Sequence, residues 1–323
     1  MNRLALSVLL ATLVGCAPSK PAETTATTTA APSEPRRRTP QQIIAEFSKK
    51  HPLSAPDDPL RHPKSIADCN EILHLDQLDL FQGAVDFLTK QPGADALALR
   101  AQLEIAHSEA QLVVAEVVSG SAETLETATR TLRFRAESGK TSEEEKTKRT
   151  AIEATFREAR DVAWALRELA AEHARNGATV AQIIMAGDEK TYRGYRIAAD
   201  YHRLRGDWDE FAEDVKVIAR ENPTSTGLLF LVAVAAQAEG DRESAQKLYR
   251  DALAKDPKFV RAQAHLVLLQ TSPDRAHAEL LKLSQLNPHH QLITVAGPFI
   301  EEADKTWRAE HTNPSRWGQT TNL

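Results

Sequence analysis

Two stretches of the chain align with each other without a gap, 34 residues apart. They read LRGDWDEFAEDVKVIARENP and AEGDRESAQKLYRDALAKDP. In both, a Gly-Asp pair (206–207 and 240–241) precedes an amphipathic run, and an Asn-Pro or Asp-Pro pair (222–223 and 256–257) ends it. Similarity at a fixed period is typical of repeat proteins, in which units stack because none can bury its apolar face alone. The C-terminal half is therefore predicted to be a stack of similar units.

The period and the pattern resemble the tetratricopeptide repeat (TPR), a helix-turn-helix unit. The best match spans 226–259, and a looser match spans 192–225, where Phe211 replaces the usual small residue. A third, shorter unit spans 260–290, so TPR-like repeats are expected over 192–290. The resemblance implies an all-α fold of helical hairpins stacked as a superhelix. In the best unit, the packing positions of the family fall on Leu229, Val232, Ala233 and Ala236 in the first helix and on Ala245, Tyr249 and Ala252 in the second.

Two long apolar seams precede the repeats, within a helical region predicted over 65–187. Apolar residues recur there at alternating steps of four and three, the spacing of one face of an α-helix. The region is either a set of degenerate repeats or a separate helical bundle. The seams consist of Leu99, Leu103, Ala106, Ala110, Val113 and Val117, followed by Ile152, Phe156, Ala159, Ala163, Leu166, Ala170 and His173.

Local signals divide this helical region into shorter helices. Ser142 and Glu145 have the spacing of a capping box, which predicts that a helix begins there. The Ser-Gly-Ser sequence at 119–121 and Gly139 predict breaks. Short breaks favour antiparallel packing within one chain, and self-association as a coiled coil is the alternative.

The first fifteen residues have the pattern of a targeting segment. A short positive region ending at Arg3 precedes an apolar run at 4–14, which is too short to span a bilayer. The run ends in Leu-Val-Gly before Cys16, which resembles the lipobox of bacterial lipoproteins. The resemblance implies that 1–15 is a signal peptide and that Cys16 becomes acylated. The alternatives are an ordinary secretory signal with a chance cysteine and a buried apolar N-terminus.

An acylated Cys16 would anchor the protein without a spanning helix, since each buried CH₂ contributes about 0.8 kcal/mol. The residue after it is Ala17 rather than Asp. In the lipoproteins that the chain resembles, this favours the outer membrane of the bacterial cell envelope. The expected location is the periplasmic face of that membrane.

Residues 16–64 are predicted to form a disordered or irregular tether. From 17 to 40 the chain is rich in Thr, Ala, Pro and Ser and cannot bury enough apolar surface to offset its entropy. A short helix is expected at 41–50, and prolines after it keep the chain irregular. Three arginines at 36–38 could contact anionic head groups or stay solvated. At the other end, 291–323 is predicted to hold a capping helix and a flexible tail.

Composition supports a helical protein and disfavours nucleic acid as a partner. The chain of 323 residues is 41% apolar, contains only 13 glycines, and has a formal charge of −5 with both signs interspersed. It therefore has no basic face of the kind that nucleic acid requires. With Cys16 acylated, Cys69 has no partner for a disulfide and is expected to be a buried small apolar residue.

No motif in the sequence predicts catalysis, a metal or a cofactor, and the chain is not expected to be an enzyme. The string from Ser244 to Lys247 has the S-x-x-K spacing but lacks the companion motifs of an acyl-serine enzyme. His289 and His290 follow the predicted end of a repeat, where a solvated or dipole-capping role is expected.

Two hypotheses for the function follow. The first is a lipid-anchored interaction or assembly module that presents its repeat groove to a protein or peptide partner. The second is an enzyme, or an accessory subunit of an enzyme of the cell wall, with a site that spacing does not reveal. Activity of the purified domain without a partner would distinguish them.

The resemblance also implies which residues line the groove. The groove positions of the first helices are Arg193, Arg196, Asp200 and Arg203 in one unit and Gly227, Phe230, Val234 and Gln237 in the next. Half of this surface is charged and half is apolar. An amphipathic helix with an acidic edge is the expected ligand. The alternative is that helices of the chain's own N-terminal half fill the groove.

Overall fold

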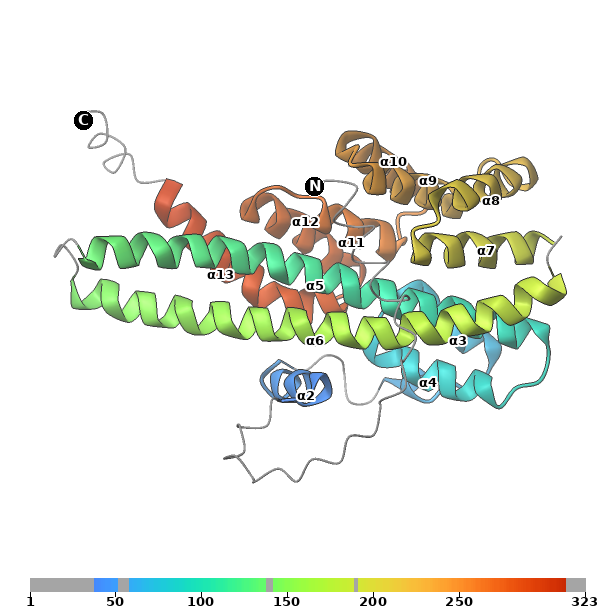
Figure 1. Ribbon diagram of the computed structural model, residues 1–323, viewed down its shortest axis with the longest axis horizontal. Helices are drawn as coiled ribbons and strands as arrows, with labels where there is room; N and C mark the ends of the chain where they lie inside the picture. The colour runs from blue at the N-terminus through green and yellow to red at the C-terminus, as the bar shows by residue number, and fades with distance from the viewer. Residues whose placement is uncertain (1–37, 52–57, 138–141, 189–190, 312–323) are drawn as a thin grey trace, which may run out of the picture.

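The computed structural model describes residues 38–51, 58–137, 142–188 and 191–311 (Figure 1). Every regular element within these ranges is helical, and the helices pack against one another. The predicted all-α fold with stacked hairpins is thereby confirmed. The predicted signal peptide, Cys16, the first part of the tether and the C-terminal tail lie outside the described residues.

Two long helices form an antiparallel hairpin along the long axis of the molecule (Figure 1). They are α5 (Ala94–Glu137, 44 residues) and α6 (Glu143–Asp188, 46 residues). Their paired residues run in opposite directions along the two helices: Glu104 pairs with His173, Glu116 with Arg167 and Arg133 with Glu153. The capping box before α6 is confirmed, because the Glu145 amide donates to the Ser142 hydroxyl at 3.2 Å and the Ser142 amide donates to the Glu145 carboxylate at 3.1 Å.

The predicted break at 119–121 is wrong, because α5 runs through it. The hydroxyl of Ser121 donates to the carbonyl of Val117 at 3.1 Å and so bonds within the helix. A glycine in a helix costs only about 1 kcal/mol relative to alanine. Val118 and Ala122, on either side of the glycine, are buried in the main core, and their burial outweighs that cost.

The middle of α5 is buried on all sides, whereas its sequence predicts a single apolar face. Every residue at 103–111 is buried. This segment lies against α6, against α3 (Ile66–Leu75) and α4 (Leu78–Thr89), and against the repeat hairpins. Cys69 on α3 is fully buried as expected, and burial raises the pKa of its thiol to about 11.

Three successive hairpins occupy the predicted repeat region. Their first helices begin at residues 192, 226 and 260, so each starts 34 residues after the one before. Gly206 and Gly240 end two of these helices in the left-handed conformation, with φ of 76° and 84°, which favours glycine. The pairs are α7 (Tyr192–Arg205) with α8 (Trp208–Glu221), α9 (Thr226–Glu239) with α10 (Arg242–Lys255), and α11 (Val260–Leu268) with α12 (Pro273–Leu286).

The packing positions of the central hairpin agree with the sequence prediction on α10 and differ at one position on α9. Ala245, Tyr249 and Ala252 are fully buried. Val232 is 36% exposed instead of packed. The reason is that α9 is apolar on nearly all sides, so its sequence pattern does not identify the side that is covered.

Helices from both ends of the described chain complete the core. A π-helical turn (Leu292–Ala296) leads into α13 (Gly297–His311), which packs on α5 and α12 as the expected capping helix. Near the N-terminus, α2 (Pro40–Lys50) confirms the short helix, and a 3₁₀ turn (Pro59–Arg61) follows it. Because Phe47 is buried against Phe299, with ring centroids 5.6 Å apart, α2 belongs to the core and not to an irregular tether.

No core boundary separates the long hairpin from the repeats. One apolar cluster contains residues of α5, α6 and α7, and another joins α2, α5 and α6 to α11, α12 and α13. The repeats are therefore built directly onto the long hairpin.

Candidate functional site

The α7 part of the predicted groove is covered by the chain's own helix α5. Arg203 on α7 donates to both carboxylate oxygens of Glu109 on α5, at 2.6 and 3.2 Å, and Arg193 pairs with Asp95 at the start of α5. Carboxylates of α5 thus occupy the α7 side of the groove from within the molecule. This corrects the expectation of an open groove. The physical reason is that α5 offers the carboxylates that the α7 arginines require.

The remaining groove residues make contacts within the repeats. Arg203 also donates to Asp200 at 3.2 Å, and the guanidinium of Arg196 lies next to Gly227. Phe230 is only 3% exposed and Val234 is also buried. Phe230 is therefore a core residue, packed against the rings of Tyr249, Phe259 and His265.

Glu109 is the centre of a buried charge network. Besides Arg203, Arg261 on α11 also forms an ion pair with the Glu109 carboxylate. The Arg261 guanidinium lies 4.8 Å from the centroid of the Phe230 ring. His265 Nε2 lies 3.4 Å from the same carboxylate. Burial opposes ionisation of Glu109, but the two guanidinium groups and His265 together hold its pKa well below the usual range. The carboxylate is therefore charged at neutral pH.

A hydrogen-bond network continues from this centre. The Tyr249 hydroxyl donates to Gln237 Oε1 at 3.0 Å, and His265 Nδ1 lies 3.0 Å from each of these two oxygens. Burial, followed by the charge of Glu109, raises the pKa of Tyr249 well above its usual range, so the hydroxyl keeps its proton. These contacts tie α10 and α11 to the Glu109 centre.

A cavity of about 90 Å³ lies beside this centre. Helices from the long hairpin and from all three repeat hairpins contribute to it. Its floor is polar and contains Glu109, Arg203 and His265, while much of its wall is apolar. The wall residues that matter below are Leu112 on α5, Trp208 on α8, Val234 on α9 and Leu268 on α11.

A second buried cluster surrounds His107, on the other side of α5. Its imidazole lies between Phe81 and His173, with ring centroids 5.1 and 3.7 Å away, and it bonds to Gln111 at 3.3 Å. Burial, followed by the nearby His173, lowers the pKa of His107 well below its usual value. His107 is therefore neutral.

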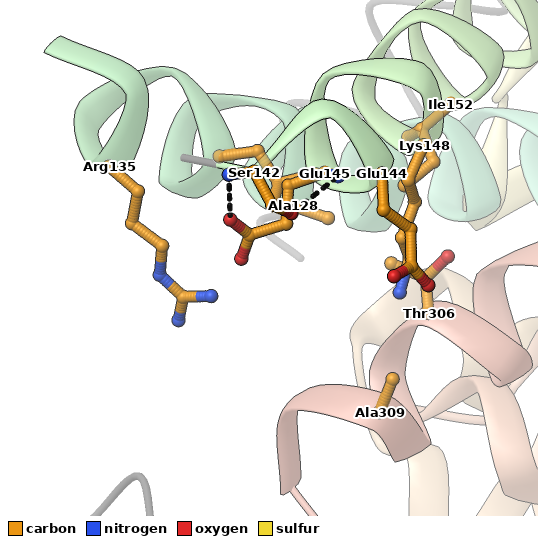
Figure 2. A pocket seen from close by; sticks show the side chains of 10 residues that line it. Ala128, Arg135, Ser142, Glu144, Glu145, Lys148, Ile152, Thr306 and Ala309 are labelled. Atoms are coloured by element: carbon orange, nitrogen blue, oxygen red, sulfur yellow. Dashed lines mark hydrogen bonds between the residues drawn. The ribbon is translucent and has the colours of Figure 1, made fainter. Parts of the chain in front are cut away.

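A larger pocket, of about 320 Å³, lies at the end of the long hairpin (Figure 2). Arg135 and Lys148 line it together with Glu144 and Glu145. Figure 2 shows the Arg135 side chain set apart from the other charged groups. Charges of both signs lie here without converging on one point, so the pocket has no defined chemistry.

The S-x-x-K string and the pair at 289–290 both make structural contacts. The Ser244 amide donates to Asp241 at 3.0 Å in a helix cap, and Lys247 pairs with Asp251 at 2.8 Å, so the S-x-x-K string forms no nucleophile and base pair. His290 is fully buried rather than solvated, and its Nε2 lies 3.4 Å from Asp76. The π-helical turn after it folds the chain back onto the core, which explains the burial.

Sequence patterns identified Arg203 and Gln237 but missed Glu109, Arg261 and His265. Glu109 and Arg261 are 152 residues apart, and no local pattern links them. The only signal was a glutamate near the apolar seam of a predicted helix, which is usually a solvated residue.

Comparison with known proteins finds no family model that matches the chain and no curated protein that matches it in sequence. Within the described ranges, none of the helices combines the length and the apolar character that crossing a membrane requires.

Proposed function

We propose that this protein is a bacterial envelope lipoprotein, anchored through Cys16 to the outer membrane, that serves as a protein interaction and assembly module in the periplasm. Its TPR-like hairpins provide the interaction surface. The partner is a protein or peptide that binds beside α5, where the repeats leave part of their inner face uncovered.

The observation that carries the proposal is the cavity between the first helices of the repeats and α5. Its rim contains Leu112, Trp208 and Leu268, which are each partly exposed and apolar. Partly exposed apolar side chains around a cavity are typical of protein interaction sites, in which a few buried anchors supply most of the binding energy.

The anchor is supported by the order of the N-terminal signals: a positive residue, a short apolar run, a small residue and Cys16. In cells given labelled palmitate, we expect the wild type to carry the label and to sediment with membranes. The Cys16→Ser variant should lose both properties. An unlabelled wild type would disprove the lipoprotein assignment.

The interaction role is tested by crosslinking in intact cells, followed by affinity purification of the anchored protein. We expect one partner to be recovered reproducibly with the wild type. The matched control is Leu281→Phe, which changes an exposed side chain on α12 away from the cavity and should leave recovery unchanged. Catalytic turnover by the purified protein alone would instead support the enzyme hypothesis.

A further inference from the structure

The pocket at the end of the long hairpin lies where the described chain ends. Leu132 of α5 and Ile152 of α6 are its buried apolar residues, and Figure 2 shows Thr306 and Ala309 of α13 across from the long hairpin. Helix α13 ends at His311, two residues after Ala309. The volume of about 320 Å³ is about twice that of an engineered cavity of about 150 Å³ that holds benzene. The pocket is therefore large enough for an aromatic side chain, and the chain leaves α13 directly beside it.

Three helices of the repeats end in an Asn-Pro or Asp-Pro pair, and the chain turns back after each pair. The carbonyl of the Asn or Asp accepts a hydrogen bond from the amide three residues later, at 3.1 to 3.3 Å, in the turns at Asn222, Asp256 and Asn287. The element after each turn packs against the helix before it: α9 on α8, α11 on α10, and the π-helical turn with α13 on α12. Such a pair is therefore a signal for chain reversal in this molecule.

The same pair recurs directly after α13. Asn313 and Pro314 belong to the segment 312–323, which lies outside the described residues. By the pattern of the repeats, this pair predicts that the chain turns back onto α13. Trp317 is the only aromatic residue of the segment. It follows His311 by six residues, which span at most about 22 Å, so its ring can reach the pocket beside the last turn of α13.

The charges of the pocket also suit this segment. Glu144 lines the pocket and forms no ion pair with any residue in the part of the chain that the structure describes. Arg316 is the only charged side chain of 312–323 and is next to Trp317. An exposed ion pair adds little affinity, but it fixes which way the segment lies. Arg135, which also lines the pocket, can interact with the face of an indole.

We infer that the pocket is the docking site of the chain's own segment 312–323, which turns back at Asn313 and Pro314 and inserts the Trp317 indole against Leu132 and Ile152. The inference goes beyond the proposed function and does not depend on it, because it concerns a different pocket and needs no partner. It differs from the flexible tail expected from the sequence. A docked segment closes this pocket to other ligands.

The first test measures the exposure of Trp317 in the full chain carrying Cys16→Ser and labelled with 5-fluorotryptophan. The chain has four tryptophans, and Trp317→Phe identifies the fluorine NMR signal of Trp317. We expect a soluble paramagnetic agent to broaden this signal at least about threefold less than the signal of Trp164, which is 40% exposed. A Trp317 signal broadened as much as that of Trp164, or more, would overturn the docking.

The second test fills the pocket. Ala309→Phe enlarges a partly exposed side chain that lines it, and the Trp317 signal should then broaden at least about threefold more than in the parent chain. Leu281→Phe, on α12 and outside the pocket, is the matched control and should leave the signal unchanged. A Trp317 signal that stays protected in Ala309→Phe would mean that the segment docks elsewhere and would disprove the pocket as its site.

A charge reversal tests the site without altering the packing. Glu144→Lys, at an exposed position, would place a positive charge beside Arg316 and should broaden the Trp317 signal at least about twofold. Glu143→Lys makes the same change one residue earlier, outside the pocket, and should broaden it less. Equal broadening in the two variants would contradict the pairing of Arg316 with Glu144.

A thermal measurement needs no label. Trp317→Ala should lower the melting temperature by at least about 2 °C in the parent chain. In the Ala309→Phe background the loss should be less than half as large, because the indole is already displaced there. Equal losses in both backgrounds would contradict the docking of Trp317 in this pocket.

Discussion

Glu109 and His107, the centres of the two buried clusters, lie two residues apart on the same helix. Glu109 is charged, whereas His107 is neutral. Two residues along an α-helix correspond to about 200°, so the side chains leave α5 on opposite sides. Glu109 faces the repeats and is ionised, and His107 faces α4 and α6 and is neutral.

The difference shows how burial sets the charge state of a titratable group when a counter-charge is near and when none is. Glu109 is surrounded by Arg203 and Arg261, whose attraction exceeds the desolvation penalty. His107 has an aromatic ring on one side and a second imidazole on the other, and no carboxylate in the described part of the chain bonds to it. The first cluster therefore depends on its partners for stability, whereas the second depends on staying uncharged.

The largest expected effect is the loss of the Glu109 charge. Glu109→Gln leaves two buried guanidinium groups facing each other, and breaking a buried pair in this way costs about 3–5 kcal/mol. Urea unfolding followed by circular dichroism measures it. The control is Glu116→Gln, a partly exposed glutamate on α5 that pairs with Arg167, for which we expect less than about 1 kcal/mol. Similar losses in both variants would contradict the comparison.

The contrast between the clusters could not be predicted from the sequence. The seam through Leu103, Ala106 and Ala110 predicted the helix and one of its buried sides correctly. Glu109 and His107 lie off that seam, where a polar residue normally means solvent. They are buried because separate parts of the chain, α4 and the repeats, cover the other sides of α5. Local periodicity carries no information about such covering.

The repeat hairpins were predictable because their signals are local. The 34-residue register and the glycines at 206 and 240 fixed where the helices begin and end. The contacts of the predicted groove residues with α5 could not be predicted, because Glu109 and Asp95 lie far from them in the sequence. Helix α5 also passed through a Ser-Gly-Ser sequence that local preference treats as a break.

The next largest effect is expected at Tyr249, which links the Glu109 centre to the core of the repeats. Tyr249→Ala removes a fully buried ring and should cost on the order of 3 kcal/mol. Tyr249→Phe keeps the ring and removes only the hydroxyl contacts with Gln237 and His265, so about 1 kcal/mol is expected. Equal losses would mean that the hydrogen bond, and not the packing, dominates at this position.

A smaller effect separates the clusters by pH. The pKa of His107 is lowered in the folded state, so below about pH 6.5 only the unfolded chain takes up this proton. The free energy of unfolding therefore decreases as the pH is lowered, by at most about 1.4 kcal/mol per pH unit. The pKa of Glu109 is also lowered, so its contribution is complete above about pH 4.5 and is lost only in stronger acid. Unfolding curves between pH 7.5 and about 2.5 cover the first window and reach into the second.

The variant His107→Phe should flatten the first window and leave the second. Because the ring stacking with Phe81 and His173 is kept, stability at pH 7.5 should change by less than about 1.5 kcal/mol. His74→Phe, at an exposed position on α3, is the control and should keep the wild-type slope. An unchanged slope in His107→Phe would show that another group titrates in this window.

The smallest effect is a gain, at a position of α5 where nothing packs against the added atom. A Cβ at Gly120 would meet nothing within 4 Å, so Gly120→Ala should stabilise the protein by up to about 1 kcal/mol through helix preference alone. Gly177 on α6 is the opposite case, because a Cβ there would lie 2.8 Å from Ile105 Cγ1 and 3.1 Å from its amide nitrogen, at the level of the two clusters. Gly177→Ala should therefore lower the melting temperature while Gly120→Ala raises it. If both variants raised the melting temperature, the space around the middle of α5 would hold an added methyl group. The packing there would then be looser than the burial of Glu109 and His107 indicates.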